Sequence, residues 1–406
     1  MTKSVSPFLS TATIIVCFAA LIGAAIARFS ALVVLLGLAM AAALVTKVWS
    51  HLCLKGVTCE RRLSEKRVFP GDEVLLTLRV VNHKVLPLPW IEIQDEVPAS
   101  LVAPTSGVGR EPSHETPGQH GLVTLSRSTP LSWYSAAIFT QRLDSSARGY
   151  YPFGPLSVVS GDIFGLHPRS LVQPDIDHLI VYPRTYALPQ LGIPSLSLLG
   201  DARSRLRVFD DPSRLVGVRD YEPGDSLRRI HWKASARSGA LQVKLFEFTT
   251  DLKVAVFLGV DTFAGRPQND LELGISTAAS VARHLMQKDV QTGLYVNTRL
   301  ADSQQPACIA AGTGAAHLAL VLEALAKTTA DADSAFVDFF ESRRGDLGFG
   351  GTLVFVVGQV PPAIELMMTD LIRAGRRIVG FKVGTDGRET HTPGAYWQTV
   401  REAVTS

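Results

Sequence analysis

The sequence predicts a multidomain protein: an N-terminal transmembrane helical hairpin, an all-β sandwich, and a doubly wound α/β domain. Residues 1–50 contain two long apolar runs, residues 56–175 alternate apolar and polar positions between turn-rich stretches, and residues 251–406 alternate short apolar runs with segments of helical period. These patterns are typical of membrane helices, half-buried strands and a helix-covered parallel sheet, respectively. A chain of 406 residues is long enough to bury more than one core.

Residues 1–50 are expected to form the transmembrane hairpin. The runs Phe8–Ala27 and Ala31–Trp49 each approach the ~20 apolar residues that cross a bilayer, and residues 28–30 separate them. A cleaved signal peptide is the alternative for the first run, because a lysine precedes it and small residues end it. The second run would then remain as a single anchor.

The basic residues around these runs predict which side of the membrane the rest of the chain occupies. Arg28 is alone in the turn, whereas six basic residues lie at or after the end of the second run: Lys47, Lys55, Arg61, Arg62, Lys66 and Arg67. Segments rich in Lys and Arg remain on the cytoplasmic side. We therefore expect a cell-membrane protein with two spans and with its soluble domains in the cytoplasm.

Residues 56–175 are expected to form an immunoglobulin-like β-sandwich. The segment Phe69–Asp72 reads Phe-Pro-Gly-Asp, a turn signal. Apolar residues then occupy every second position: Val74, Leu76, Leu78 and Val80. A further strand is expected at Trp133–Phe139, between two turn-rich stretches. Short strands separated by turns in this way favour two packed antiparallel sheets.

Four aromatic residues of this domain have two interpretations: Trp90, Trp133, Tyr150 and Tyr151. They form a ligand-stacking platform, or they pack between strands, which is the usual role of aromatic residues in β domains. The domain shows no titratable cluster that indicates catalysis. The four cysteines, at positions 17, 53, 59 and 308, lack the paired spacing of zinc sites. No cofactor is therefore expected.

Residues 251–406 are expected to form the α/β domain. Val254–Val260 is a continuous apolar run that predicts a buried strand, and apolar residues of helical period follow it: Leu271, Ile275, Ala278, Ala282 and Leu285. Further strands are expected at Gln291–Val296, Leu353–Val357 and Arg377–Val383, and further helices at His317–Ala326 and Ala363–Ala374. This alternation predicts a parallel, doubly wound sheet.

The connecting region, residues 176–250, contains the most specific motif of the chain, VRDYEPGDSLRRIHWKASARSGALQVKLFE. Its Pro-Gly pair suits the centre of a type II turn, and Asp225 after it can cap a short helix. The helix is expected to end at Gly239, followed by a strand from Leu241.

This motif resembles the signature of the domain of unknown function 58 family. The residues that carry the resemblance are Arg219, Tyr221, Gly224, Asp225, Arg229, His231 and Trp232. The order of parts is also similar: an apolar N-terminal hairpin, a β-rich region ending in Gly-Asp-Ile-Phe-Gly-Leu at Gly161–Leu166, and an α/β region. The resemblance implies a membrane-anchored, von Willebrand factor A-like protein, associated with MoxR-type AAA+ ATPases and with transglutaminase-like membrane proteins.

A von Willebrand A-like domain commonly has a magnesium-binding DxSxS motif after its first strand, with a carboxylate and two hydroxyls as ligands. The corresponding stretch is Asp261-Thr262-Phe263-Ala264-Gly265. The carboxylate is retained, but a phenyl group and a glycine replace the hydroxyls. We therefore expect a degenerate metal site in which Asp261 is the weak remaining candidate.

Ten basic and five acidic residues lie between Arg203 and Lys244. This stretch is a solvated surface paired internally, a patch for an acidic partner or an anionic membrane lipid, or a nucleic-acid site. Nucleic acid is not expected, because the net charge of the chain is only +3 and no recognition motif is present.

These features favour a non-catalytic, membrane-anchored adaptor or scaffold, which binds a MoxR-type AAA+ ATPase or another envelope-associated partner through the seven signature residues. The alternative is a hydrolase at the cytoplasmic membrane face, serine-dependent through Ser226 and His231 or metal-assisted through Asp261. Gly224–Leu227 spells the Gly-Asp-Ser-Leu motif of one hydrolase family. The Asp-x-x-His that such enzymes need near the C-terminus is absent, because Asp175–His178 lies upstream.

Overall fold

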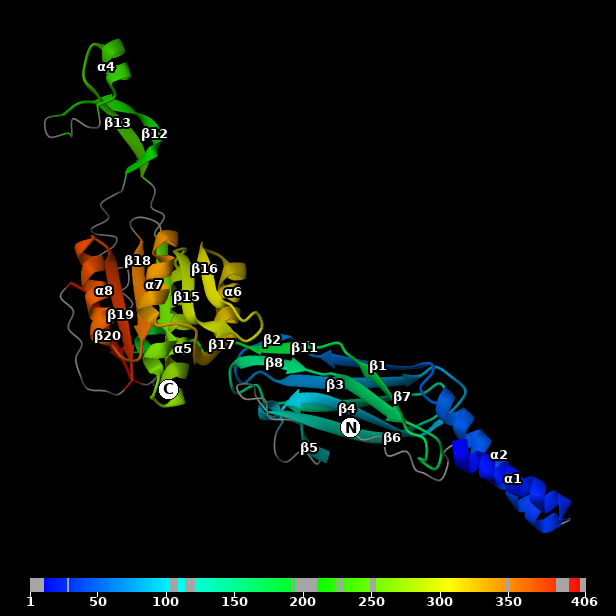
Figure 1. Ribbon diagram of the computed structural model, residues 1–406. Coiled ribbons are helices and arrows are strands. Elements are labelled where there is room, and N and C mark those ends of the chain that lie inside the picture. The colour runs from blue at the N-terminus through cyan, green and yellow to red at the C-terminus, as the bar shows by residue number, and fades with distance from the viewer. Residues whose placement is uncertain are drawn as a thin grey trace. The chain divides into compact units, whose positions relative to one another are not determined.

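The chain folds into two compact units, Met1–Tyr182 and Pro183–Ser406 (Figure 1). The computed structural model describes residues 11–27, 29–102, 109–113, 121–191, 193, 210–222, 225, 230–248, 253–347, 351–384 and 394–401. The described part of the first unit has two helices and three β-sheets, and that of the second has a seven-stranded sheet and a two-stranded hairpin.

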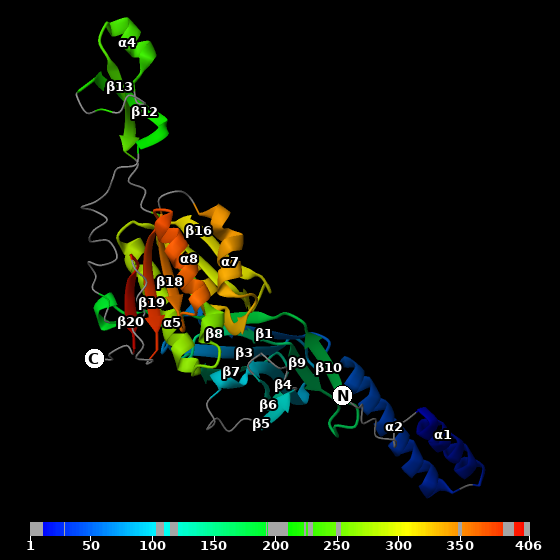
Figure 2. The ribbon, with the colours of Figure 1, turned by 60° about the vertical axis from the view of Figure 1, so that its left-hand side comes forward.

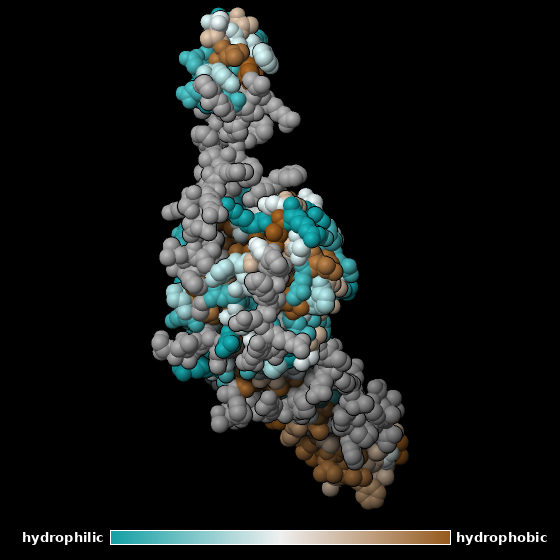
Figure 3. All heavy atoms as spheres, turned by 90° about the vertical axis from the view of Figure 1, so that its left-hand side faces the viewer, coloured by the Kyte–Doolittle hydropathy of each residue, from teal (hydrophilic) through white to brown (hydrophobic). Residues whose placement is uncertain are grey.

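Two apolar helices begin the first unit, as predicted. α1 spans Thr11–Ile26 and α2 spans Ser30–Leu52, and Figures 1 and 2 both show them side by side. Large apolar side chains are exposed along both helices, and they form the brown lower end of the molecule in Figure 3. Among the described helices, α2 alone is long and apolar enough to cross a membrane.

A β-sandwich-like region follows the helices. One sheet has the strand order β1-β3-β7, formed by Val57–Leu63, Val74–Asn82 and Ala136–Leu143. A second has the order β10-β9-β4-β6-β5, formed by Arg169–Gln173, Leu156–Ser160, Leu88–Pro98, Leu122–Leu131 and Gly109–Ser113. A third has the order β2-β11-β8, formed by Arg67–Val68, Asp177–Val181 and Gly149–Phe153.

Alternating side chains from these sheets form one hydrophobic core. The four apolar residues predicted to face inward from β3 are all buried, and Ile91 and Ile93 of β4 join the same cluster. Period-two alternation is what a strand with one buried face requires. The prediction of a sandwich-like all-β region is confirmed at this level.

The predicted strand at Trp133–Phe139 is wrong at its start. Trp133 and Tyr134 form a turn, and β7 begins only at Ala136. The hydroxyl of Ser135 donates to the carbonyl of Ser132 at 2.8 Å and closes this turn. The aromatic pair reads as strand by composition, but its backbone is bent by local hydrogen bonds.

The four aromatic residues considered as a platform are dispersed. Tyr151 is fully buried, and its hydroxyl donates to the carbonyl of Ala147 at 3.0 Å. Trp90 donates from Nε1 to the carbonyl of Asp162, Tyr150 stacks on His178, and Trp133 is exposed. The interpretation as packing holds for Tyr151 but is wrong for Trp133.

The sandwich core contains one buried carboxylate. The alternation of β4 places Asp95 on the inward face, where Nη1 of Arg61 lies 3.6 Å from its Oδ1. Among the described residues, neither oxygen of Asp95 accepts a hydrogen bond. Burial raises the pKa of Asp95 to about 7, and the charge of Arg61 opposes this shift only in part.

The second unit is built on a mixed sheet with the strand order β16-β15-β14-β18-β19-β20. Its parallel strands are β14 Lys253–Gly259, β15 Gln291–Leu300, β18 Thr352–Val357, β19 Arg377–Val383 and β20 Tyr396–Val400. β16 Pro306–Gly312 and β17 Thr328–Ala332 both pair antiparallel with β15. The expectation of an all-parallel sheet is therefore wrong at this edge, because two short strands return along β15.

Helices cover this sheet. α5 Gln268–Gln287 buries the five predicted apolar residues, and it contacts β14, β15 and α6 Ala315–Ala326. α7 Phe336–Arg343 and α8 Pro362–Arg373 pack on the aromatic face of β14 and β18. The predicted helices at α5, α6 and α8 are confirmed, whereas α7 is an additional short helix.

The region between the two predicted domains is partly structured. β11 pairs with β8 and β2 in the first unit. Residues 183–193 belong to the second unit, where Leu188, Leu191 and Ile193 are buried and the backbone N–H of Tyr186 donates to the hydroxyl of Ser280 on α5 at 2.9 Å. The beginning of the predicted connecting region thus contributes to the cores of both units.

Candidate functional sites in the signature hairpin and at the carboxyl edge of the sheet

The signature segment forms a β-hairpin with a short helix between its strands. β12 Asp210–Asp220 pairs antiparallel with β13 Gln242–Phe248, and α4 spans Trp232–Ser238. Gly239 ends α4 in the left-handed conformation, with φ of 73°, as predicted. The described helix α4 begins at Trp232, and the residues that follow the predicted start at Asp225, 226–229, lie outside the described residues.

Among the described residues, the partners of Asp225 come from the end of β12 and from Glu222, and the residues it was predicted to cap, 226–229, lie outside the described part of the chain. Nη1 of Arg219 donates to its Oδ2 at 2.8 Å, and Nη2 donates to its Oδ1 at 2.6 Å. The backbone N–H of Glu222 also donates to Oδ2 at 3.0 Å. The hydrogen bond to Asp225 raises the pKa of Arg219. A bidentate guanidinium–carboxylate pair fixes direction as well as distance, so this pair ties Asp225 to the end of β12.

His231 is the cap of α4. Its Nδ1 accepts a hydrogen bond from the backbone N–H of Ala234 at 3.1 Å, and its own backbone N–H donates to the carbonyl of Gln242 at 2.7 Å. The hydroxyl of Ser235 accepts from the backbone N–H of Gln242 at 2.8 Å. Because Nδ1 holds a lone pair, the proton of the neutral ring is on Nε2. His231 thus joins α4 to β13.

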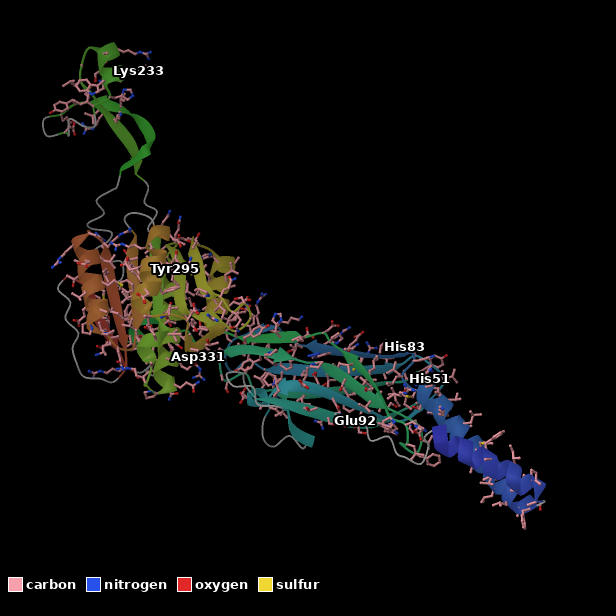
Figure 4. All side chains as sticks on the ribbon, viewed as in Figure 1. His51, His83, Glu92, Lys233, Tyr295 and Asp331 are labelled. Carbon is pink, nitrogen blue, oxygen red and sulfur yellow. The ribbon has the colours of Figure 1, made fainter. Side chains whose placement is uncertain are left out.

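Trp232 has a different environment from these residues, because its side chain is 68% exposed. It is the first residue of α4, and Lys233 and Arg237 on the same helix are also exposed. Figure 4 shows the Lys233 side chain extending outward from α4. The exposed surface of α4 therefore presents an aromatic ring among basic groups.

The remaining signature residues divide into two groups. Tyr221 is half-buried, and its backbone N–H donates to the carbonyl of Leu241 at 2.9 Å. Gly224 and Arg229 lie outside the described residues, as does Ser226. The structure thus brings Arg219 together with Asp225, and His231 together with Trp232, within one hairpin.

The carboxyl edge of the large sheet contains the candidate metal residue, Asp261. Its Oδ1 accepts from Nδ2 of Asn297 at 2.7 Å, and its Oδ2 accepts from the backbone N–H of Phe336 at 3.0 Å. Phe336 is the first residue of α7. A carboxylate at a helix N-terminus satisfies a free N–H and interacts favourably with the helix dipole. Asp261 therefore has two structural partners.

Asn297 connects the ends of β14 and β15 at this edge. Its Oδ1 accepts from the backbone N–H of Val260 at 2.7 Å, and its Nδ2 also donates to the carbonyl of Ser334 at 2.9 Å. Asn297 is fully buried. Buried side-chain amides of this kind are retained because their hydrogen bonds are satisfied.

Ligands of open α/β sheets bind outside the carboxyl ends of the strands where the strand order reverses, and in this mixed sheet the order reverses between β14 and β18. In this protein that position is closed by Thr262, whose Oγ1 donates to the carbonyl of Gly259 at 2.5 Å and accepts from the backbone N–H of Gly358 at 2.8 Å. The Phe263 ring lies between Gly274 and Gly358, where an added Cβ would approach it to 2.6 and 2.7 Å, respectively. The phenyl group that replaces the hydroxyl of DxSxS is thus part of the core.

Among the described residues, no group of three or more His, Cys, Asp or Glu side chains is arranged to hold a metal ion. Residues 217–361 match the family described as protein of unknown function DUF58. The chain contains a DUF58 domain. The match begins within β12 and ends immediately before α8, so the DUF58 domain includes most of the signature hairpin and strands β14 to β18.

One relative is similar to more than half of the chain. The chain is 23% identical over 250 residues to the uncharacterized protein YeaD of Bacillus subtilis strain 168. The alignment covers 59% of this chain and 56% of YeaD, so the chain spans little more than half the length of this relative.

Similar solved structures share little sequence with the chain. They include a CARDB domain of Pyrococcus furiosus in complex with di-metal ions (9% identity, 31% of this chain and 91% of that chain, TM-score 0.19) and a cohesin module from a Clostridium perfringens family 33 glycoside hydrolase (12%, 31% and 96%, TM-score 0.20). The C-terminal domain of wzt gives 10% identity, 31% and 73% coverage, and a TM-score of 0.21. The sandwich described above rests on its strand pairings and not on these similarities.

Two polar residues that form hydrogen bonds at the carboxyl edge of the large sheet, Asn297 and Thr262, were not indicated by the sequence alone. Asn297 follows an apolar run as one polar residue among many, and its partners come from segments 36 or 37 positions away. In the sequence, Thr262 is distinguished only by its place after Asp261. One signal in the sequence could have found them. Both residues come shortly after a predicted strand, Thr262 after Val254–Val260 and Asn297 after Gln291–Val296, and functional polar residues converge at the carboxyl ends of parallel strands.

Proposed function

We propose that this protein is a non-catalytic adaptor or scaffold anchored in the cell membrane, which binds a protein partner through the signature hairpin. The resemblance of the chain makes a MoxR-type AAA+ ATPase the first candidate, and a transglutaminase-like membrane protein the second. The process in which it acts follows from the partner.

The observation that supports this proposal best is the division of labour within the hairpin. Arg219, Asp225 and His231 make the hydrogen bonds that hold the backbone, whereas Trp232 is exposed. An exposed tryptophan on a fixed backbone has little conformational entropy to lose on binding, and Trp is among the residues that contribute most to protein interfaces. Lys233 and Arg237 around it favour a partner with an acidic rim.

The geometry gives little support to the hydrolase alternative. A serine hydrolase needs the unprotonated ring nitrogen of its histidine to face the serine hydroxyl. Nδ1 of His231 accepts from the backbone, which leaves Nε2 as the protonated nitrogen of the neutral ring. For metal-assisted hydrolysis, Asp261 would need further ligands beside it, and among the described residues no group of three or more His, Cys, Asp or Glu side chains is arranged to hold a metal ion. We therefore keep the adaptor as the single proposed function.

The finer fold assignments form part of the same proposal. With β17 set aside, the sheet order counted along the chain is 3-2-1-4-5-6, the doubly wound order, which supports a von Willebrand A-like domain. The hydrogen bond from the hydroxyl of Tyr151 to the backbone four residues upstream resembles the tyrosine corner of immunoglobulin-like sandwiches.

The anchor is proposed to be a hairpin of two spans. The described part of α1 covers 16 residues, against the ~20 that cross a bilayer, and the apolar run in the sequence begins at Phe8. Exposed apolar side chains on both helices need an apolar environment: Phe18, Ile22, Ile26, Leu35 and Leu38. Basic residues after α2 support a cytoplasmic location of the soluble units, although Arg61 is buried in the sandwich.

Affinity capture of the full-length protein from detergent-solubilised native membranes tests the adaptor proposal. We expect wild type to retain a specific protein, an AAA+ ATPase in the first instance, and Trp232→Ala to reduce its retention at least tenfold, as hot-spot tryptophans do. Tyr396→Ala is the matched control, because Tyr396 is an exposed aromatic residue of the same unit that lies outside the hairpin. Equal retention by Trp232→Ala and wild type would contradict the hairpin as the binding surface.

A further inference from the structure

The C-terminal end of α2 is joined to the β-sandwich by side-chain hydrogen bonds. Nζ of Lys84 donates to the carbonyls of Leu52 at 2.9 Å and Lys55 at 2.8 Å, and also to the carbonyl of Cys53. These include carbonyls that a helix leaves unpaired at its C-terminus, where a cation is favourable. The hydroxyl of Ser50 donates to the carbonyl of His167 at 2.7 Å. Hydrogen bonds therefore attach the C-terminal end of α2 to the sandwich.

The loop after β9 lies at this end and displays two large apolar residues. Oδ1 of the buried Asp162 accepts from the backbone N–H of His167 at 2.7 Å, and its Oδ2 accepts from that of Phe164 at 3.2 Å. Gly165 takes a left-handed conformation, with φ of 68°. These contacts fold the loop so that Ile163 and Phe164 project into solvent, with 58% and 69% of their surfaces exposed.

The turn between β6 and β7 lies at the same end of the sandwich and exposes two aromatic residues. The backbone N–H of Tyr134 donates to the carbonyl of Lys84 at 3.2 Å, so the turn contacts the residue that caps α2. Trp133 and Tyr134 are 64% and 68% exposed. Tyr134 has a φ of 46°, a conformation that is unfavourable for a bulky side chain and recurs at functional positions. Val85, beside Lys84, is also exposed.

These loops lie at the depth where a membrane crossed by α2 would end. The 23 residues of α2 span about 34 Å at 1.5 Å per residue, against about 30 Å for the hydrocarbon core. The last two or three residues of α2 would therefore reach the headgroup region, and Ser50 binds the loop there. Tryptophan and tyrosine are enriched at this depth in membrane proteins.

Basic and titratable groups surround the same end. His51 contacts Arg169, with 3.4 Å between Nδ1 and Nη2, and His83 contacts Thr58 at 3.0 Å. Figure 4 shows His51 and His83 at the α2 end of the sandwich. Cationic side chains near apolar loops favour the headgroups of anionic lipids.

We propose that the sandwich rests on the bilayer that α2 crosses, with Trp133, Tyr134, Ile163 and Phe164 inserted among the lipid headgroups and upper acyl chains. This inference depends on the membrane anchor in the proposed function and adds a second contact to it. The loops would orient the sandwich on the membrane together with the hydrogen bonds that join it to α2. Insertion of this kind buries side chains about 5–10 Å into the interface.

Depth-dependent quenching of a single fluorescent label tests this proposal. The full-length protein, with Cys17 and Cys308 replaced by Ala, is reconstituted in vesicles of phosphatidylethanolamine and phosphatidylglycerol. Cys53 and Cys59 are buried and are retained. An environment-sensitive NBD label is attached in turn at Phe164→Cys, Trp133→Cys and the control Phe69→Cys. Phe69 is 45% exposed and lies at the opposite end of the sandwich, because it precedes the start of β3, whose last residue contacts the β6–β7 turn.

We expect labels at positions 133 and 164 to be quenched by a lipid with a nitroxide near its headgroup and to be at least threefold less accessible to iodide than the label at position 69. All labels share the same orientation in the vesicle, so the ratio does not depend on sidedness. If the labelled protein floats with the vesicles but the labels at positions 133 and 164 are as accessible to iodide as the label at position 69, the proposal is overturned and the anchor is left intact. Shielding from both quenchers would indicate a protein cover instead of lipid and would also overturn it. If the protein does not float with the vesicles, the membrane anchor is overturned, and this inference with it.

Discussion

Replacement of Asp261 by Ala distinguishes a structural carboxylate from a residual metal ligand. The substitution removes the acceptors for Nδ2 of Asn297 and for the backbone N–H of Phe336. A hydrogen bond to a charged group contributes about 1.5–3 kcal/mol. The two lost hydrogen bonds together cost less than twice this free energy, because Asp261 is half-buried and Asn297 retains Ser334 as a partner. We therefore expect a loss of roughly 2–4 kcal/mol in the free energy of unfolding.

For a unit of this size, such a loss corresponds to a decrease in melting temperature of roughly 5–15 °C. The assay is thermal denaturation of the full-length protein in detergent, with and without millimolar Mg²⁺. Asp331→Ala is the control, because Asp331 is an exposed carboxylate of the same unit, on β17. The reasoning is refuted if Mg²⁺ stabilises wild type, Asp261→Ala loses that stabilisation, and the two melt alike without the cation. Asp261 would then be a metal ligand.

Two further predictions concern the cores. The pKa of Asp95 is raised to about 7 from 3.8, so its contribution to stability is complete below about pH 4 and is lost as the pH rises through 7. Between pH 4 and 8 it should amount to roughly 4 kcal/mol, measured by urea unfolding, and Asp95→Asn should flatten that part of the profile; an unchanged slope would contradict the assignment. Gly274→Ala should destabilise by about 1–3 kcal/mol through its contact with Phe263, and Phe263→Ala by about 3–5 kcal/mol. The double variant should lose less than the sum, whereas strict additivity would mean that the two residues do not compete for one space.

The α/β strands were predictable because their burial is a local property of sequence. β14, β18 and β19 are continuous apolar runs, and buried parallel strands require this composition. The edge strands β16 and β17 are largely exposed, so they have no such run and were not predicted. α7 was also missed, because its eight residues are too few to establish a helical period.

The candidate site was predictable only in part. The glycine that ends α4 follows from its position in the motif, since left-handed conformations favour glycine. The partners of Asp225 and His231 do not follow from position. Each side chain had several backbone or side-chain partners within reach, and the observed choice depends on how β12, α4 and β13 meet. A prediction from residue type alone therefore gave the glycine that ends α4 but did not give the pairing of Asp225 with Arg219.

The polar residues of the DUF58 domain share one property that bears on its function. At the sheet edge, Asp261, Thr262 and Asn297 use their side chains to bind backbone groups or each other. In the hairpin, Arg219, Asp225 and His231 do the same. A catalytic group must instead keep a reactive atom available to substrate. Large apolar or aromatic side chains are exposed as well, at Trp232 in the hairpin and, outside the DUF58 domain, at the α2 end of the sandwich. Such surfaces gain free energy by excluding water against a partner or a membrane, which is why we favour association over chemistry.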